Sequence, residues 1–479
     1  MQKSKLIVLL LILFYIVYFT LVGFLRFDNF YAGRFDLGNM DQTVWNTAHG
    51  RIFQLTDPNG TEIISRLAFH ADFILILLAP FYFIWENAKM LLLIQSSVIG
   101  FGAFFVYLIS QKILKNNLVS VILSVTYLLN PALQHSNLYD FHAVTLATTF
   151  LLAAFYFFLE KRYFLFLLLV ILSALTKEQV WTIASLFGLY LFIPQLISLI
   201  KKKVFVKKEL LIGIALFVLS LLIFYTLVWK AIPNARGGNH FALSYYSEFG
   251  TSPGNIIKNI ILSPGKTLNT FLQPDRLEYL KQIFLPLGYL PLLSPLILIF
   301  AAPDLMINLL SNNSQLHQIF YQYTATITPF LFIAAIYSIK QLKNLFPKIP
   351  FTVFSLFLIL SSLFSSIEFG PLPFSKSPNI LMFTKPLAYR STVENFLATI
   401  GEDKGVAATN NLGAHLSHRQ RIYTIPTGLN KADYIVFLLN DPTAQPSLDA
   451  QIKMAGELEE NKNYIELYRL EDFVVFKKK

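Results

Sequence analysis

Residues 1–24 read MQKSKLIVLLLILFYIVYFTLVGF, and the apolar run within them continues to about residue 25. A helix needs about 20 apolar residues to span the hydrocarbon core of a bilayer. Lys3 and Lys5 precede the run, and no small-residue cleavage site follows its core. We therefore predict a retained first membrane helix and not a removed signal peptide.

The composition extends this expectation to the whole chain. Of its 479 residues, 55% are hydrophobic and only 14% are charged, against about 25% charged residues in an ordinary soluble domain. The net charge is +11, but the lysines cluster between apolar runs, as topology signals do. We therefore predict a polytopic helical membrane protein that contacts membrane lipids and binds no nucleic acid. The chain has no cysteine, which excludes disulfides and thiolate catalysis.

Hydropathy predicts an all-α membrane domain with about nine full crossings. The apolar runs assigned to these crossings lie at 5–25, 88–110, 117–133, 143–159, 163–176, 179–200, 209–230, 320–339 and 349–367. Two further stretches, 71–85 and 284–311, are short or interrupted by prolines. We expect them to enter and leave on the outer side as short or re-entrant segments, because prolines interrupt helices and irregular backbone needs cover at membrane depth.

Basic residues fix the sidedness, because lysine and arginine in short loops favour the cytoplasm. The groups that nine crossings place inside are Lys3 and Lys5, Lys112 and Lys115, Lys161 and Arg162, the lysines of 201–208, and Lys340 with Lys343. The stretch 163–200 tests this assignment of crossings, because a single helix of that length would measure ~60 Å, which is too long for one crossing. We predict a hairpin that turns near residues 176–178. The N-terminus is then cytoplasmic, and the chain is a multi-pass protein of the plasma membrane.

We predict a division into two parts. Residues 1–367 form the transmembrane domain, with outer loops at 26–87 and 231–283. Residues 368–479 carry more charge and shorter apolar runs, and we expect a small extracytoplasmic α/β domain there. Its expected elements are the strands GVAATN, RIYTIP, DYIVFLL and DFVVFK, together with a polar helix over 448–461.

In this predicted topology most polar side chains lie at the outer face, where loops commonly carry function. Ionisable groups at membrane depth are candidate functional residues by default. Our candidates there are Asp36, Asp41, Trp45, His49, His70, Asp140, His142, Lys177, Glu178, Arg236, His317 and Tyr321.

Several of these residues have an alternative structural interpretation. Asp41 fits the first turn of a helix capped by Asn39, where a carboxylate favours the helix N-terminus. Asp36 precedes that cap, so a favourable position in the first helical turn does not explain it. Asp41, Trp45 and His49 recur every four residues and form one helical face, which an amphipathic helix on the membrane surface would also show.

Asp140 and His142 flank Phe141, so an extended turn would put both on one side. Such a pair is a candidate ligand set for a divalent metal such as Mg²⁺ or Mn²⁺, and it is equally typical of a capped turn. Lys177 and Glu178 either neutralise one another at a helix turn or anchor a substrate anion. No GK[ST] loop, HExxH or GxSxG motif occurs, which argues against ATP-driven transport and against common metalloprotease and hydrolase schemes.

The motifs occur in an order that is similar to that of a known family. FDLGNMDQTVWNTAHG (35–50), FHADFILILLAPFYFIW (69–85), NPALQHSNLYDFHAVTLA (130–147), the TKE turn and ATNNLGAHLSHRQRIYTIP (408–426) resemble a family of predicted membrane proteins of unknown function. That family resembles the GT-C-type glycosyltransferases, which take sugars from polyprenyl-phosphate donors. GT-C enzymes carry an essential acid in the first outer loop.

The resemblance implies an integral-membrane glycosyltransferase that moves a hexosyl or pentosyl group from a polyprenyl-phosphate sugar to an unknown acceptor, with a role in the cell envelope. It implies that Asp36 corresponds to the essential catalytic acid of those enzymes, and that Asp41 is the second candidate for this role. Many GT-C members have two adjacent acids, whereas Asp41 lies five residues after Asp36. A carboxylate suits proton abstraction from an acceptor and stabilisation of an oxocarbenium-like state, and nearby cations suit the departing phosphate.

Two other functions fit parts of the sequence. A transporter or lipid flippase usually carries ionisable groups near the bilayer midplane within repeated halves, whereas the predicted helix centres here are nearly free of charge. A membrane-anchored binding protein without catalysis explains the C-terminal part but not the outer acids.

Overall fold

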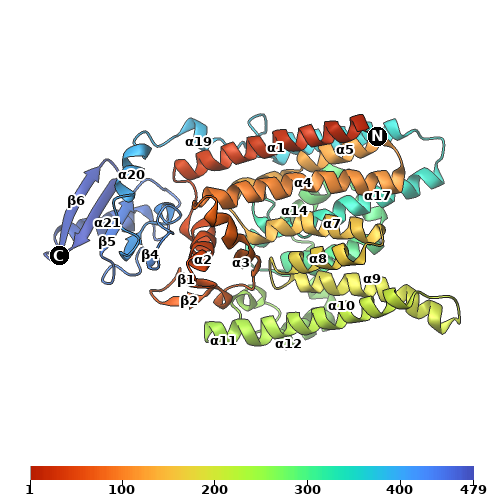
Figure 1. Cartoon of the computed structure of the whole chain (residues 1–479), viewed down its shortest axis with the longest axis horizontal. Coiled ribbons are helices and arrows are strands. Elements are labelled where there is room, and N and C mark those ends of the chain that lie inside the picture. Colours follow the sequence, from red (N-terminus) through yellow and green to blue (C-terminus); the bar gives the residue numbers. More distant parts are fainter. Residues whose placement is uncertain (1) are drawn as a thin grey trace.

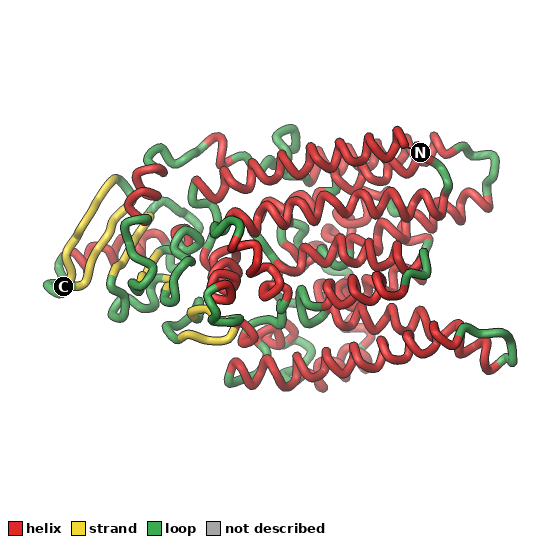
Figure 2. Tube along the Cα trace, viewed as in Figure 1, coloured by secondary structure: helices red, strands yellow, loops and turns green. Residues whose placement is uncertain are grey.

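The computed structural model describes residues 2–479, and its helices form an elongated bundle with a small sheet at one end (Figures 1 and 2). The N-terminus lies at the opposite end of the bundle. Between the bundle and the sheet lies a layer that contains α2 (Asn39–Ala48), α3 (Ile74–Leu78) and the antiparallel pair β1 (Gln54–Thr56) and β2 (Ile63–Ser65). This intermediate layer is built from the predicted outer loop 26–87.

Within residues 2–479, five helical stretches are long and apolar enough to cross a membrane. They are α1 (Gln2–Asp28), α4 (Lys89–Leu114), α9 (Val180–Ile200), α10 (Lys207–Thr226) with its continuation into α11 (Ile232–Arg236), and α18 (Phe351–Phe369). A sixth crossing results if α5 (Asn117–Leu128) and α6 (Pro131–Tyr139), which meet at 40°, form one bent span.

The predicted count of nine crossings is not confirmed. The runs at 143–159 and 163–176 form α7 (Leu146–Leu159) and α8 (Tyr163–Ala174), which have 14 and 12 residues. Both are shorter than the ~20 residues that a full crossing needs. The run at 117–133 ends early because Pro131 starts a new helix, capped by the side chain of Asn130.

Other predicted details of the bundle are confirmed. The stretch 163–200 turns between α8 and α9 at residues 175–179, as the length argument requires. The stretch 284–311 is broken into short helical pieces that include α15 (Pro295–Leu298) and α16 (Ala302–Leu310). Proline stands in the first turn of each piece, where its missing N–H costs nothing.

The bundle packs around α17 (Thr328–Leu345), whose residues 328–336 are all buried. The connections α4–α5, α9–α10 and α17–α18 lie at the N-terminal end of the bundle in Figure 1. An ion pair of 2.8 Å between Lys112 and Glu160 brings the α7–α8 turn to the same end. The basic groups that predict cytoplasmic loops therefore share one end of the bundle, opposite the sheet.

The remaining helices of the helical part belong to the predicted outer loop 231–283 and its continuation. They are α12 (Pro253–Leu262), α13 (Pro264–Phe271) and α14 (Pro274–Phe284), each of which begins with proline.

The C-terminal part is a five-stranded mixed sheet in the order β4-β3-β5-β7-β6. Its elements are α19 (Leu381–Thr384), α20 (Arg390–Leu397), β3 (Val406–Ala408), β4 (Ile422–Thr424), β5 (Tyr434–Leu438), α21 (Leu448–Glu459), β6 (Tyr464–Leu470) and β7 (Phe473–Lys478). Strand β3 pairs in parallel with β4 and β5, and β7 pairs antiparallel with β5 and β6.

The sequence predicts four of these strands and helix α21, because they are buried apolar runs or a polar helix. It misses β6, whose side chains are mostly exposed and which therefore lacks the apolar pattern of a buried strand.

One glycine contact makes a test of the bundle possible. A Cβ atom on Gly188 in α9 would lie 2.5 Å from the backbone nitrogen of Phe217 and 2.7 Å from the carbonyl oxygen of Gly213 in α10. Because backbone cannot yield as a side chain can, we expect Gly188→Ala to destabilise the fold by about 1–3 kcal/mol. Thermal unfolding in detergent measures this. Gly254→Ala, where a Cβ meets no atom within 4 Å, is the control, and equal unfolding temperatures of the two variants would contradict the contact.

Candidate functional site

A cavity of about 430 Å³ lies where the intermediate layer meets the bundle. Its walls come from six segments that are distant in sequence: the turn before α2, the stretch 58–72, the segment after α6, the turn between α8 and α9, and the loops near 236–245 and 315–323. The lining side chains that were predicted as functional are Asp36, His70, His142, Lys177 and Arg236.

Asp36 stands in a π-helical turn, Arg34–Gly38, that leads directly into α2. Such one-turn π segments are frequent at functional sites. The tyrosine hydroxyl of Tyr139 donates to one carboxylate oxygen of Asp36 over 3.0 Å, and Nε2 of His142 donates to the other over 3.1 Å. The Asp36 side chain keeps 31% of its surface exposed. Since Asp36 lines the cavity, its carboxylate is oriented but still accessible from it.

The surroundings of Asp36 favour its charged form. Burial raises the pKa of this carboxyl, but the hydrogen bond and charge of His142 and the hydrogen bond of Tyr139 outweigh burial and bring the pKa below its usual value. Both ring nitrogens of His142 face oxygen atoms, since Nδ1 lies 3.3 Å from the carbonyl oxygen of Asp140. The imidazole can therefore donate a proton toward the carboxylate.

Asp140 lies behind Asp36 and does not line the cavity. One of its carboxylate oxygens accepts the backbone N–H of Gly33 over 3.1 Å, which fixes the start of the turn that carries Asp36. Burial, followed by repulsion from Asp36, raises the pKa of Asp140 to about 7. The two carboxyls therefore differ in charge state near neutral pH, with Asp36 ionised and Asp140 partly protonated.

Cations that pack on aromatic rings form another wall of the cavity. The ammonium of Lys177 lies 5.5 Å from the ring centre of Tyr323. The Arg236 guanidinium lies 5.6 Å and 5.5 Å from the ring centres of Phe69 and Phe241. These contacts hold the cations without neutralising them, so this wall suits an anion.

Arg66 and Asp72 have a different role, because they form a buried ion pair of 2.8 Å. Their charges compensate one another, so the pair adds no net charge to the wall.

A second cavity, of about 250 Å³, shares His70 and Lys177 with the first and extends toward apolar residues of the bundle. Glu178 lines it, accepts hydrogen bonds from His70 over 2.9 Å and from the backbone N–H of Ala71 over 3.0 Å, and lies 3.5 Å from His240. Burial raises the pKa of Glu178, but the imidazoles of His70 and His240 outweigh it and lower the pKa well below its usual value.

His70, Glu178 and His240 are candidate metal ligands by their types, because their ligand atoms lie within 4.8 Å of one another. Their hydrogen bonds do not fit this role. The backbone N–H of Ala242 donates to Nδ1 of His240, which leaves the ring proton on Nε2, the atom that faces Glu178.

The predicted metal pair fits no better, because its ligand atoms are already hydrogen-bonded. Asp140 accepts from Gly33, and Nε2 of His142 donates to Asp36.

Asp41, Trp45 and His49 lie on the other face of α2, away from the cavity that Asp36 lines. Asp41 is fully buried and accepts hydrogen bonds from Tyr82 and Ser417, with His418 3.1 Å away. The indole N–H of Trp45 donates to Glu86 over 2.6 Å, and the His49 ring packs against the same indole at a tilt of 35°. The predicted helical face is therefore present, and it packs against the C-terminal part and the end of the intermediate layer.

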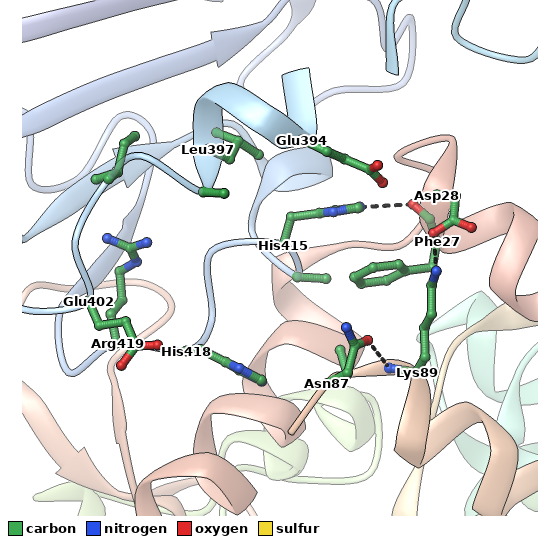
Figure 3. Close-up of a pocket in the computed structure, with 14 residues that line it drawn as sticks. Phe27, Asp28, Asn87, Lys89, Glu394, Leu397, Glu402, His415, His418 and Arg419 are labelled. Carbon is green, nitrogen blue, oxygen red and sulfur yellow. Dashed lines mark hydrogen bonds and ion pairs between the residues drawn. The ribbon is translucent and has the colours of Figure 1, made fainter. Parts of the chain in front are cut away.

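A third cavity, of about 510 Å³, lies beside this face and is drawn in Figure 3. His418 and Glu402 lie on one side of it, and the ion pair between Asp28 and Lys89 lies on the other (Figure 3). Burial lowers the pKa of His418, but the charge of Asp41 outweighs it and brings the pKa above its usual value.

His317 and Tyr321 also lie outside the first cavity. His317 is buried and lies 2.9 Å from Asp275. Tyr321 packs edge-on against Tyr139, the residue that donates to Asp36. Tyr321 is thus placed to support Tyr139 and not to line the cavity.

The sequence argument did not select Tyr139, Arg66 or His240 as site residues. Tyr139 directly precedes Asp140 in the quoted motif, so its neighbourhood was a usable signal. Arg66 and His240 stand alone in long loops, and only the folded chain shows their partners.

The raised pKa of Asp140 generates a pH test. Between its ordinary pKa of 3.8 and about 7, the folded chain keeps a proton that the unfolded chain loses. The stability associated with that proton is present at low pH and is lost as pH rises through about 7. We expect the unfolding temperature of Asp140→Asn minus that of the wild type to increase from about pH 5 to about pH 8. Glu460→Gln, an exposed change, is the control. A difference for Asp140→Asn that is independent of pH would contradict the raised pKa.

Comparison with solved structures identifies the architecture. The crystal structure of ArnT from Cupriavidus metallidurans bound to undecaprenyl phosphate superposes with a TM-score of 0.54 over 97% of each chain, at 11% sequence identity. The apo oligosaccharyltransferase of Archaeoglobus fulgidus covers 88% of this chain and 65% of its own, with 14% identity and a TM-score of 0.44. The ArnT superposition confirms the expected likeness to GT-C glycosyltransferases at the level of the fold.

Sequence comparison adds the family. No curated protein matches the chain. The profile of the predicted membrane proteins called DUF2079 matches residues 26–472. This range includes Asp36, both neighbouring cavities and nearly all of the C-terminal part. The chain belongs to the DUF2079 family of predicted membrane proteins.

Proposed function

We propose that this protein is an integral-membrane glycosyltransferase that moves a sugar from a polyprenyl-phosphate donor to an acceptor at the outer membrane face. One observation carries the proposal: an ionised, oriented carboxylate, Asp36, lines the same cavity as the cations Lys177 and Arg236. A base and an anion-binding wall in one cavity are what glycosyl transfer from a phosphate ester requires. The ArnT-like fold supports this choice.

In the proposed reaction Asp36 is the general base. An acceptor hydroxyl attacks the anomeric carbon, and the bond between that carbon and the phosphate oxygen of the donor breaks. The hydroxyl proton passes to Asp36, and the bonding electron pair leaves with polyprenyl phosphate. His142 and Tyr139 hold the carboxylate while it accepts the proton, and Lys177 and Arg236 balance the charge of the departing phosphate.

The second cavity suits the lipid part of the donor. Phe224 in α10 and Val228 just after it line this cavity together with Lys177. A phosphate near Lys177 would therefore continue into an apolar path beside a candidate membrane span. Among the other predicted residues, His70 lines both cavities and is hydrogen-bonded to Glu178 in the second, and we propose that they orient the donor.

The sidedness follows from the same arrangement. We propose that the end of the bundle with the basic loops is cytoplasmic and that the cavities and the C-terminal part are extracytoplasmic, in the plasma membrane.

Asp36 provides the direct test of the function. The purified protein in nanodiscs is incubated with a panel of polyprenyl-phosphate sugars and candidate acceptors, and released polyprenyl phosphate is measured. We expect Asp36→Asn to lower the release rate by at least about 100-fold, the usual contribution of a general base. Asp403→Asn makes the same chemical change at a carboxylate that is 73% exposed, and we expect it to leave the rate unchanged. Release that is equally fast in both variants would exclude Asp36 as the base, and no release from any donor would reject the function.

Lys177 tests the anion wall separately. We expect Lys177→Ala to lower the rate of transfer, because the departing phosphate loses a positive charge, and Lys177→Arg to retain more activity than Lys177→Ala. The same release assay measures both. Equal activity of Lys177→Ala and wild type would remove Lys177 from the proposed mechanism.

The absence of cysteine makes the sidedness easy to test. Single-cysteine variants Lys203→Cys, in the α9–α10 turn, and Glu460→Cys, after α21, both change exposed residues. In intact cells we expect a membrane-impermeant maleimide to label Glu460→Cys and to label Lys203→Cys only after permeabilisation. The reverse pattern would invert the orientation.

A further inference from the structure

We infer that the C-terminal part positions the proposed base, and that Asn410 is the positioning residue through which it acts. The inference rests on the proposed function insofar as Asp36 is the base. The inference concerns the contact between two segments. The acid turn is residues 33–38, which hold Asp36, and the anchoring segment is residues 410–422, which connect β3 with β4.

The side chain of Asn410 holds the start of the acid turn. Its Oδ1 accepts the backbone N–H of Arg34 over 2.9 Å and the backbone N–H of Phe35 over 3.2 Å. The first N–H groups of a helical turn have no partner within the helix. Asn410 supplies that partner from a residue 376 positions later in the chain, and the two bonded residues directly precede Asp36.

Close backbone packing reinforces these hydrogen bonds. A Cβ atom on Gly413 would lie 2.1 Å from Cβ of Arg34, and one on Gly38 would lie 3.2 Å from the backbone of Ala414. A Cβ on Gly33 would lie 2.8 Å from the Asn410 amide. Three glycines therefore allow the two segments to touch at a distance that side chains would prevent, so the acid turn has little freedom to shift.

The buried Arg34 extends the contact into α2. Its guanidinium donates to Asn39, to Gln42 over 2.7 Å and to the carbonyl oxygen of Thr56 over 3.2 Å. Gln42 in turn donates to the carbonyl oxygen of Arg419 over 2.8 Å. This network connects the acid turn, α2 and the anchoring segment through side chains that are shielded from water, where hydrogen bonds resist exchange with solvent.

The anchoring segment also holds the opposite face of α2. Ser417 donates to the buried carboxylate of Asp41, and His418, at the edge of the cavity in Figure 3, lies 3.1 Å from it. Asp41, predicted as a second catalytic acid, is thus used to attach α2 to the C-terminal part. With both faces held, α2 and the turn before it have a fixed orientation relative to the bundle.

The C-terminal part contributes no described residue to the lining of the Asp36 cavity. Among the described residues, those that line the Asp36 cavity lie between Phe35 and Tyr323. Residues of the anchoring segment do not line it, although Asn410 binds the two residues next to Asp36. A positioning role accounts for both facts.

The test compares two neighbouring asparagines in the full-length protein in nanodiscs. Asn410→Ala removes the acceptor for the acid turn. Asn411→Ala is the matched control, because Asn411 bonds to Leu438 and Asn440 inside the C-terminal part. Amide hydrogen exchange of a peptide that covers residues 33–42 is the first readout. We expect exchange about threefold to tenfold faster in Asn410→Ala, the effect of one lost hydrogen bond at each of the two amides that it holds, and unchanged exchange in Asn411→Ala.

Kinetics of polyprenyl-phosphate release from a polyprenyl-phosphate sugar are the second readout. We expect Asn410→Ala to lower kcat by about 10- to 100-fold with little change in the KM of the donor, because a displaced base affects the reaction more than binding. Asn410→Asp keeps an acceptor oxygen, and we expect it to restore the exchange protection.

The two readouts separate the possible failures. Unchanged exchange at 33–42 in Asn410→Ala, or equal acceleration in both alanine variants, would overturn the positioning role whatever the activity. If the wild type released no polyprenyl phosphate, the proposed function would fail, while the exchange experiment would still decide whether Asn410 fixes the acid turn. Faster exchange with an unchanged kcat would show that Asn410 orders the turn without affecting the reaction, and would overturn the inference.

Discussion

The cost of unpaired polar groups in lipid governs the arrangement of this molecule. Backbone and side-chain polar groups at membrane depth must find partners inside the protein, so the long helices are apolar and many of the irregular segments lie at one end. There the turn before α2, the α8–α9 turn and the loops near 240 and 320 meet around one cavity. The same constraint that makes the chain a membrane protein thus brings residues from 36 to 323 into one place.

Around this cavity the two neighbouring carboxyls, Asp36 and Asp140, differ in their charge state. Asp36 is bonded to His142 and Tyr139 and keeps its negative charge, whereas Asp140, behind it, is buried more completely and has a pKa of about 7. Carboxyls whose environments move their pKa values apart are typical of sites that transfer protons. Lys177 and Arg236 pack on aromatic rings, which hold a cation without neutralising it. The cavity therefore contains separate negative and positive walls at short range.

Patterns that depend on local sequence predicted much of the fold. Apolar length predicted a polytopic helical protein, alternation and burial predicted β3, β4, β5 and β7, and loop charge predicted that five basic groups share one side. The number of crossings could not be obtained in this way, because proline and loop packing shorten helices that hydropathy alone would extend. The same sidedness argument predicted that polar residues would gather, but it could not separate Asp36 from Asp41.

The different roles of Asp36 and Asp41 depend on contacts with residues that are distant in the sequence. Spacing placed Asp41, Trp45 and His49 on one helical face, and the face exists. Its partners are Ser417 and His418 in the last quarter of the chain, and no local pattern identifies them. In the same way, the capping interpretation of Asp41 considered Asn39, whereas the structure buries Asp41 against a different part of the molecule.

The distance between Arg34 and Asn410 has a consequence for biosynthesis. The acid turn is made 376 residues before its hydrogen-bond acceptor in Asn410. Contacts of such sequence separation form late, because the intervening chain must be in place first. A nascent or truncated chain can therefore contain every wall of the cavity, from Phe35 to Tyr323, and still lack a fixed acid. The contact between Asn410 and the turn can form only after residue 410 has been made.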